Sequence, residues 1–382
     1  MLAAACAVAA IALILAAFYS KASRSFIPQL FIPLMVLIGL STVAGLMVAE
    51  PQLRLGLLEL GALLTIPLVW QSARTLTAKL TYLTVVLISA LSLVGSDLLT
   101  ERGEGGWARA LLLTSVCVKL AAVPLFFWLL SLADELPAVV LGTIIAVVDM
   151  AAFGEFWLTA RSTPDLFVPG GILLGAAAVS SFLAALMMLT QRSLKRLLVL
   201  STVEDVGFLL LGLASARVLG YNGALLAAST HALAKALLFV CLSAPEADGA
   251  LTGEATGLAT RYPVSAFGFL FGMLAMLGIP PMMGFLGRWR LYETALQINP
   301  LLLTVFVLSS IFALIAYVLA LTRVWWGPAQ ATDPPLSSPS QPVAHPTSEP
   351  LVLQGVIVAL VGMLLLAGCW PGLLGTLMGG KL

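Results

Sequence analysis

The chain has 382 residues, of which 60% are hydrophobic and only 10% are charged, and its mean hydropathy is +1.07. Because a soluble domain carries about 25% charged residues, this chain could not cover a surface in water, and we expect it to lie in a membrane. The formal net charge of +1 argues against nucleic acid or another strongly polyanionic partner.

Long apolar runs follow one another along the chain. A helix needs about 20 apolar residues to cross the hydrocarbon core, and charges, prolines and glycines separate runs of that kind. We therefore expect an all-α polytopic membrane protein with about twelve transmembrane helices. The runs lie near residues 2–19, 28–49, 54–72, 79–98, 107–131, 137–160, 168–190, 196–216, 222–243, 263–286, 299–326 and 351–379.

The first run has no basic residue before it and two after it, Lys21 and Arg24. A signal peptide shows the opposite order, so we expect this run to stay in the protein as a helix. The stretch 327–350 is polar and rich in proline and serine. This composition predicts an exposed loop before the last helix.

Seven ionisable residues lie inside the apolar runs or directly beside them. A charge near the bilayer centre costs several kcal/mol and persists only where it faces a partner or a water-filled cavity. Static ion pairs between helices are one explanation. A path that passes protons between groups of alternating sign is the other, and seven positions are more than packing requires. In chain order the residues are Glu59, Lys119, Asp149, Asp205, His231, Lys235 and Arg288.

His231 and Lys235 are four residues apart, so they share one face of the ninth predicted helix. A lone buried histidine is usually structural, but a lysine one turn away favours a role in proton transfer. Lysine suits such a path because burial weakens its hold on the proton and a nearby carboxylate strengthens it again.

Prolines interrupt two of the runs. Pro124 removes a backbone hydrogen bond close to Lys119, and Pro280 and Pro281 lie in the tenth run shortly before Arg288. Two broken helices, each with a basic residue nearby, are typical of transporters built from inverted repeats. Ordinary proline kinks are the alternative.

Five segments of the chain, in order, resemble one known family. That family comprises the antiporter-like membrane subunits of respiratory complex I, above all the quinone-proximal type, and the related subunits of Mrp-type antiporters and membrane-bound hydrogenases. The similarity runs from about residue 55 to residue 326. The segment LLELGALLTIPLVW (57–70) resembles the family's glutamate helix, and VKLAAVPLFFWLLSLADELPAVV (118–140) resembles its broken lysine helix. Three further segments resemble the blocks that follow in the family: QRSLKRLLVLSTVEDVGFLLLGLAS (191–215), GALLAASTHALAKALLFVCL (223–242) and AMLGIPPMMGFLGRWRLYETAL (275–296).

The resemblance implies roles for these residues. Glu59 matches the glutamate that controls the proton affinity of the broken-helix lysine, which is Lys119 here. His231 and Lys235 match the histidine–lysine helix of a second half-channel, and Arg288 stands where the quinone-proximal subunit has a lysine. Two inverted five-helix repeats are also implied. The chain would then divide into an N-terminal helix (1–27), the first repeat (28–160), the second repeat (161–326), the loop (327–350) and a C-terminal helix (351–382).

The sequence departs from the family pattern at several of these positions. Asp149 stands where the family usually has a lysine, and Asp205 and Phe126 stand where it often has histidines. A carboxylate at position 149 would face Lys119 and either lock it in the charged form or serve as an altered relay step. Arg288 raises a similar question, because arginine does not release its proton in proteins.

The resemblance implies a proton-translocating subunit of a redox-driven, complex I-like assembly in an energy-transducing membrane such as the bacterial plasma membrane. Two alternatives stay open: a subunit of a multi-subunit cation/proton antiporter that exchanges Na⁺ or K⁺, and a transport-inactive membrane scaffold. The sequence has no Gly-rich nucleotide loop, flavin motif or cysteine cluster, so we expect no cofactor or metal on this chain. NADH or ferredoxin, flavin, iron–sulfur clusters and quinone would belong to partner subunits.

Overall fold

The computed structural model describes residues 1–20, 28–167, 171–252, 255–328, 349–370 and 372. Every regular element in those ranges is helical, which confirms the predicted all-α class. Most of the predicted loop 327–350 lies outside them. The elements are α1 (Leu2–Ala17), α3 (Pro28–Met47), α4 (Pro51–Ser72), α5 (Leu76–Glu101), α6 (Gly105–Lys119), α7 (Phe127–Glu135), α8 (Ala138–Gly142), η1 (Thr143–Val148), α9 (Asp149–Ser162), η2 (Pro164–Leu166), α10 (Gly171–Met188), α11 (Leu194–Ala214), α12 (Val218–Ala247), η3 (Leu258–Thr260), α13 (Pro263–Met276), α14 (Gly284–Ile298), α15 (Pro300–Ala320), η4 (Leu321–Trp325) and α16 (Leu351–Cys369).

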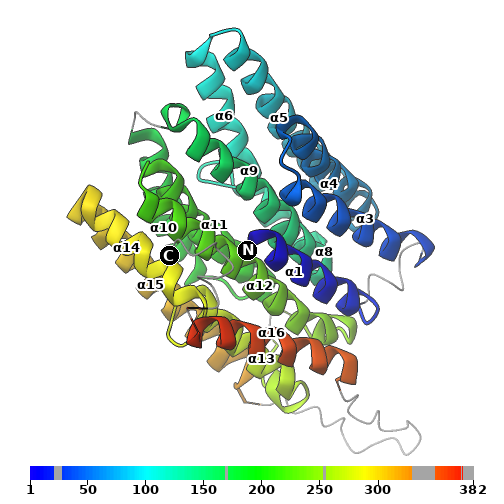
Figure 1. Cartoon of the computed structure of the whole chain (residues 1–382). Coiled ribbons are helices and arrows are strands. Elements are labelled where there is room, and N and C mark those ends of the chain that lie inside the picture. Colours follow the sequence, from blue (N-terminus) through cyan, green and yellow to red (C-terminus); the bar gives the residue numbers. More distant parts are fainter. Residues whose placement is uncertain (21–27, 168–170, 253–254, 329–348, 371, 373–382) are drawn as a thin grey trace, which may run out of the picture.

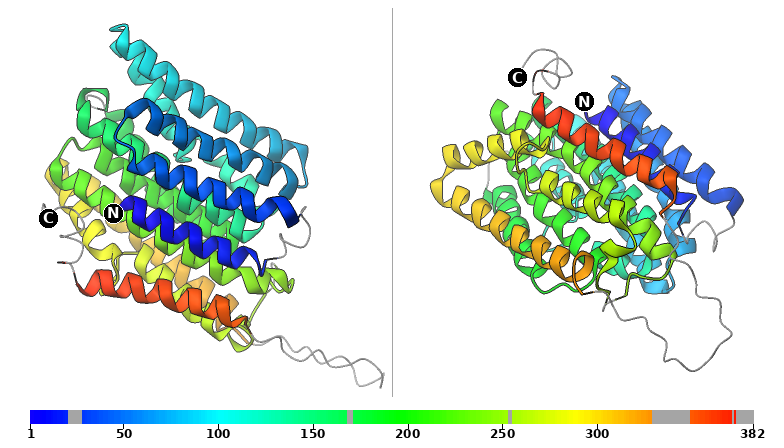
Figure 2. Two further views of the ribbon diagram at one scale, coloured as in Figure 1. Left: turned by 45° about the vertical axis from the view of Figure 1, so that its right-hand side comes forward. Right: turned by 90° about the horizontal axis from the view of Figure 1, so that it is seen from below.

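The helices lie roughly alongside one another in a single bundle (Figure 1). Helices α3 to α6 lie on one side, α13 to α16 lie on the other, and α9, α11 and α12 run between them (Figure 1). The two further views show the same order (Figure 2). Helix α1 packs against α3, α12 and η1, so it covers the middle of the bundle.

Three segments form the inner part of the bundle. Every residue is buried from Ala138 to Phe156, from Leu197 to Ser215 and from Leu226 to Pro245. The outer helices instead leave many apolar side chains exposed, such as Leu91 on α5 and Leu351 on α16. Exposed apolar side chains suit contact with lipid, whereas ionisable side chains on the inner segments are shielded from it by protein.

Nine helices in the described ranges are long and apolar enough to cross a membrane, which agrees with nine of the predicted runs. The helices at the other three predicted runs are each shorter than a membrane-crossing helix. Near residues 2–19 the helix α1 has only 16 residues, and the runs near 107–131 and 263–286 are each broken within the bundle. A broken helix is divided into pieces that are individually too short to span the hydrocarbon core.

The first break lies where Pro124 predicted an interruption. Helix α6 ends at Lys119, and α7 begins only at Phe127. In the gap, the Val123 N–H donates a hydrogen bond of 2.9 Å to the Ser180 Oγ on α10. A non-helical backbone at membrane depth is tolerated where protein satisfies its polar groups, and Ser180 does this here.

The second break lies between α13 and α14. The Met283 N–H donates to the Leu364 carbonyl on α16 at 3.0 Å, so a neighbouring helix again pairs with the freed backbone. Gly278 has a φ of +67°, and a Cβ atom there would lie 2.7 Å from the Arg288 Cγ. Glycine therefore allows both the turn and the close approach of the arginine side chain.

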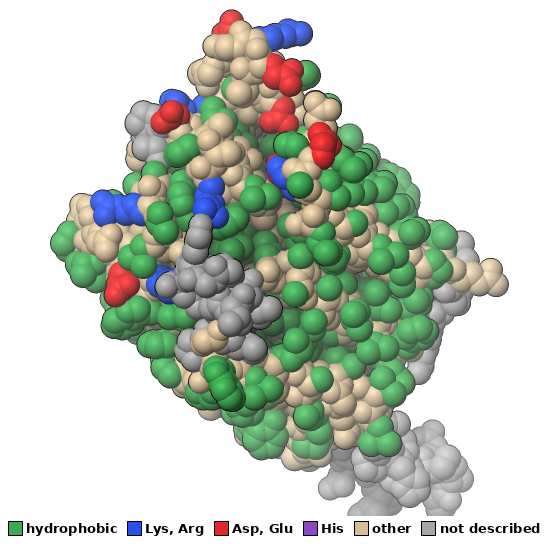
Figure 3. All heavy atoms as spheres, viewed as in Figure 1, with side chains coloured by type: hydrophobic (Ala, Val, Ile, Leu, Met, Phe, Trp, Pro, Cys, Tyr) green, Lys and Arg blue, Asp and Glu red, His purple; other side chains and the backbone are tan. Residues whose placement is uncertain are grey.

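Ion pairs join the helices at the two ends of the bundle. Arg54 pairs with Glu155 at one end, and Lys195 pairs with Glu246 at 2.9 Å at the other end. Figure 3 shows hydrophobic side chains over much of one face, with most of the charged side chains toward its upper and left edges. This distribution fits a protein whose middle contacts lipid and whose ends contact water.

Candidate functional site

Lys119 and Glu59 form an ion pair inside the bundle. Lys119 is the last residue of α6, beside the first break, and its Nζ contacts the Glu59 Oε1 on α4. The two side chains are only 9% and 12% exposed. In the described ranges the second carboxylate oxygen, Glu59 Oε2, has no hydrogen-bond partner. Removing either residue would leave an unpaired ion away from water, which makes the pair strongly interdependent.

A small cavity lies between Lys119 and Asp149. Its volume is about 20 Å³, and Tyr82 and Ser89 supply further polar lining. Asp149 is 5% exposed, and its side chain makes no hydrogen bond or ion pair with any residue that the structure describes. A polar cavity of roughly 10–15 Å³ holds one water molecule. The cavity is therefore large enough for one water molecule between the Lys119 ammonium and the Asp149 carboxyl group, which make no direct ion pair with each other.

Asp149 begins α9 directly after the π-helical segment η1. Its own N–H donates to the Ile144 carbonyl, one residue farther back than in an α-helix. The extra residue in the turn changes which face of the following helix looks toward α6. Single π-turns inside helices are frequent at functional sites for this reason.

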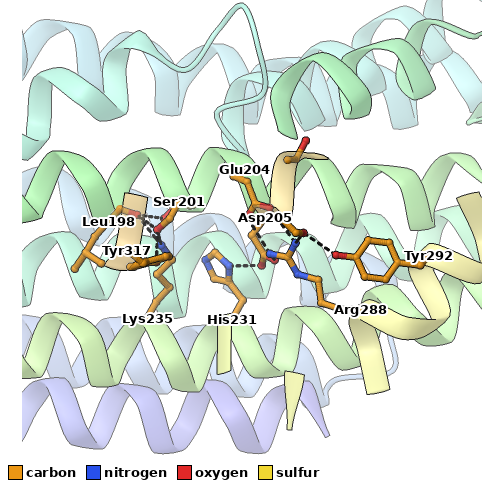
Figure 4. A network of polar contacts seen from close by, with 12 residues as sticks. Leu198, Ser201, Glu204, Asp205, His231, Lys235, Arg288, Tyr292 and Tyr317 are labelled. Carbon is orange, nitrogen blue, oxygen red and sulfur yellow. Dashed lines mark hydrogen bonds and ion pairs between the residues drawn. The ribbon is translucent and has the colours of Figure 1, made fainter. Parts of the chain in front are cut away.

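Arg288 holds two carboxylates on α11 (Figure 4). Its Nη1 and Nη2 donate to the two Glu204 oxygens, each at 2.9 Å, and Nη2 also donates to the Asp205 Oδ1 at 2.9 Å. The guanidinium carbon lies 3.8 Å from the centre of the Phe208 ring. Because arginine keeps its proton, this arrangement favours the ionised form of both acids.

His231 contacts the same cluster from α12. Its Nδ1 lies 2.7 Å from the Asp205 Oδ2. Its other nitrogen, Nε2, is buried and has no hydrogen-bond partner among the described residues. A carboxylate accepts hydrogen bonds but cannot donate them, so the Nδ1 carries the hydrogen in this contact.

Lys235 lies one turn further along α12, on the side that faces α11. Its Nζ donates to the Leu198 carbonyl at 2.6 Å and also contacts the Ser201 Oγ. The Ser201 Oγ accepts a hydrogen bond of 2.8 Å from the Tyr317 hydroxyl of α15. Lys235 is completely buried, yet within the described ranges its only partners are uncharged.

The seven residues proposed from the sequence fall into two clusters. The first contains Glu59, Lys119 and Asp149, and the second contains Asp205, His231, Lys235 and Arg288. No hydrogen bond joins the clusters in the part of the chain that the structure describes. The sequence-based prediction missed Glu204. An acidic residue inside the eighth apolar run is the signal that could have identified it. Hydroxyl groups carry no such signal, so the prediction also missed Ser201, Tyr292, Ser310 and Tyr317.

Curated bacterial proteins with similar sequences include a subunit of NADH-quinone oxidoreductase and a hydrogenase-4 component. The "NADH-quinone oxidoreductase subunit N 2" of Acidobacterium capsulatum is 30% identical over 273 residues, which cover 67% of this chain and 53% of that protein. The "Hydrogenase-4 component F homolog" of Methylacidiphilum infernorum is 28% identical over 225 residues, covering 58% and 47%. The chain thus spans about half the length of the curated relatives it matches.

Solved structures of low sequence identity share the fold. A chain of the Mrp complex from Dietzia sp. DQ12-45-1b has a TM-score of 0.82 at 20% identity, with 98% of this chain and 80% of that chain covered. A chain of respiratory complex I from Thermus thermophilus with bound aureothin has a TM-score of 0.73 at 23% identity, with 96% and 85% covered. Residues 98–313 match the family described as "NADH:quinone oxidoreductase/Mrp antiporter, TM", more than half of the sequence. The protein is therefore a member of the NADH:quinone oxidoreductase/Mrp antiporter family of membrane proteins.

Proposed function

We propose that this chain is a proton-translocating, antiporter-like subunit of a redox-driven membrane assembly related to respiratory complex I. The observation that carries this proposal is the buried Glu59–Lys119 pair at a helix break, beside a cavity shared with Asp149. An ammonium held by one carboxylate, with a second acid reachable through water, suits reversible proton transfer. Electron transfer in partner subunits would act by moving Glu59 relative to Lys119.

We also propose twelve membrane crossings that include two inverted repeats, with the boundaries predicted from the sequence. Each half contains one broken helix, α6–α7 in the first and α13–α14 in the second. Each half also pairs a carboxylate on its second helix with a basic residue on its broken helix. The pairs are Glu59 with Lys119 and Glu204 with Arg288, and this correspondence supports the repeat.

The groups that exchange protons in this proposal are Lys119, Asp149, His231 and Lys235. Each can change its charge, and each has an uncharged form that burial favours. Glu59 would tune Lys119, because a carboxylate in contact favours the ammonium form. Arg288 has a different role: it fixes the charge of its neighbours and passes no proton itself.

The other subunits of the assembly would supply the electron transfer. The relatives of this chain include a subunit of NADH-quinone oxidoreductase and a hydrogenase-4 component, which supports an electron-transfer partner. NADH or ferredoxin, flavin, iron–sulfur clusters and quinone would be bound by those partner subunits. This chain would contribute a proton path in the bacterial plasma membrane or an equivalent membrane.

Reconstitution of the assembly that contains this chain tests the proposal. We expect proton movement into or out of vesicles only when an electron donor is supplied, independent of Na⁺ and K⁺. Cation-dependent proton exchange without a donor would instead show a cation/proton antiporter. If replacing both Glu59 and Lys119 leaves the donor-driven proton movement unchanged, this chain is a scaffold.

A further inference from the structure

We propose that Arg288 and Asp205 are positioning residues for His231. They hold its imidazole in the tautomer that carries a hydrogen on Nδ1, and they thereby leave Nε2 as the proton-accepting atom of the second cluster. The geometry stands independently of the proposed function, whereas the consequence for proton transfer rests on it. The sequence alone places all three residues among the candidates for a proton path, without separate roles.

Asp205 is fixed as an ion by its surroundings. Its Oδ1 accepts from the Arg288 Nη2 at 2.9 Å, and the side chains of Asp205 and Arg288 are 4% and 3% exposed. The Arg288 guanidinium is itself fixed by hydrogen bonds to both Glu204 oxygens and by its contact with the Phe208 ring. The guanidinium cannot rotate away without breaking these contacts, so the carboxylate stays in one place and one charge state.

The fixed carboxylate selects one form of His231. Asp205 Oδ2 lies 2.7 Å from Nδ1 and can only accept a hydrogen bond. In the neutral imidazole the hydrogen is therefore on Nδ1, and Nε2 presents a lone pair. Figure 4 shows the ring between Asp205 and Lys235, with one ring nitrogen joined to Asp205 and the other on the Lys235 side.

The charges of the cluster sum to zero when His231 is neutral and Lys235 carries its proton. Glu204 and Asp205 contribute two negative charges, and Arg288 and Lys235 contribute two positive charges. Tyr317, which reaches Lys235 through Ser201, and Tyr292, which reaches Arg288 through Ser310, add uncharged hydroxyl groups. A proton that arrives on Nε2 creates an imidazolium whose charge the Asp205 carboxylate stabilises.

The proton step that follows from this arrangement is balanced within the cluster. The Lys235 ammonium would lose a proton and become an amine, while the His231 Nε2 gains the proton and the ring becomes an imidazolium. No hydrogen bond joins the two groups among the described residues, so this step requires the Lys235 side chain to leave the Leu198 carbonyl and reach the ring. The carboxylates and Arg288 keep their charge states throughout. The summed charge stays at zero, so the step avoids creating an uncompensated buried ion.

The chain offers a direct spectroscopic test because it contains only two histidines, His231 and His345. The His345→Gln variant leaves a single imidazole in this chain, whose two nitrogens are observed by ¹⁵N NMR when the histidine label is confined to this chain within its membrane assembly. Near neutral pH we expect a protonated Nδ1 and an unprotonated Nε2. A protonated Nε2 in this parent protein would overturn the proposal, whatever the substitutions below show.

Two substitutions in the His345→Gln parent test whether Asp205 and Arg288 fix the tautomer of His231. In Asp205→Asn the amide can donate to Nδ1, and in Arg288→Gln the carboxylate loses its fixed partner. We therefore expect loss of the single tautomer in both. Arg288→Lys, which keeps the positive charge, should retain the Nδ1–H form at least partly. The matched control is Asp165→Asn at an exposed position, which should leave the spectrum unchanged. An unchanged tautomer in both test variants would contradict positioning.

The same preparations separate this inference from the proposed function. The expected spectra in an assembly that moves no protons would support positioning while contradicting proton translocation. Donor-driven proton transport together with a protonated Nε2 would contradict positioning and leave the proposed function intact. Where Arg288→Gln does not assemble, the parent spectrum and Asp205→Asn still decide the question.

Discussion

At the level of single residues, Asp149 differs from the two acids of the second cluster. Glu204 and Asp205 both form ion pairs with Arg288, whereas the Asp149 carboxyl group lines the cavity that it shares with Lys119. Burial favours the neutral form of a carboxyl group that no fixed cation holds, whereas a nearby ammonium such as that of Lys119 favours the ionised form. In our proposal, the acid that stands here in place of the family's usual lysine exchanges protons with Lys119.

Asp149→Asn should remove this acceptor while keeping its shape. We expect donor-driven proton transport to fall by about a hundredfold, the lower end of the effect of a well-placed acid–base group. The thermal stability of the assembly should hardly change, because the Asp149 side chain has no hydrogen bond to lose among the described residues. Asp165→Asn is the matched control at the exposed end of the bundle. Transport at the wild-type rate in Asp149→Asn would show that Lys119 passes its proton elsewhere.

At the level of elements, the first break depends on a hydrogen bond from another helix. Ser180 on α10 accepts from the Val123 N–H, while the adjacent Ser181 Oγ is buried without any partner in the described ranges. The two serines therefore form a matched pair. Ser180→Ala should destabilise the protein by about 1–3 kcal/mol, because it leaves a buried N–H unpaired. Ser181→Ala should be neutral or slightly stabilising.

Thermal or denaturant unfolding of the two serine variants in detergent measures this difference. Equal stability of the two variants would mean that the break does not depend on the Ser180 contact. Transport should also fall in Ser180→Ala alone, since Lys119 ends the helix that the break terminates.

The contact between α10 and α11 depends on a missing side chain. A Cβ atom at Gly207 would lie 2.5 Å from the Ala177 carbonyl oxygen and 2.7 Å from the Ser181 nitrogen, whereas at Gly175 it would meet nothing within 4 Å. Gly207→Ala must therefore push the helices apart, and we expect a loss of about 1–3 kcal/mol in unfolding free energy. Gly175→Ala should stabilise α10 by about 0.5–1 kcal/mol. Similar melting temperatures for both variants would contradict this packing.

At the level of the whole molecule, much of the fold follows from simple patterns. Runs of about 20 apolar residues identify crossing helices, because the bilayer accepts little else. Pro124 and Pro280–Pro281 mark the breaks, because proline cannot donate the missing hydrogen bond. Composition cannot show which helices lie inside. The inner helix α11 and the outer helix α16 are both long and apolar enough to cross a membrane, so the inner position emerges only from packing.

The site could be predicted only in part, for physical reasons. An ionisable residue in an apolar run is conspicuous, and this signal identified all seven proposed residues. Which of them meet depends on the packing of helices far apart in sequence, as for Asp205 and Arg288. The pairing of Glu59 with Lys119 came from the family resemblance and not from the pattern of residues. Neutral partners such as Ser201 are ordinary residues in a membrane helix and carry no signal.

The most direct measurement is the number of protons moved per electron pair by the reconstituted assembly, compared between the wild type and Lys119→Ala. We expect proton movement through this chain to be lost, so that the ratio falls by the contribution of one subunit, while electron donor oxidation continues. Glu59→Gln should lower the ratio in the same way, because the carboxylate controls the ammonium. An unchanged ratio in both variants would contradict proton translocation by this chain.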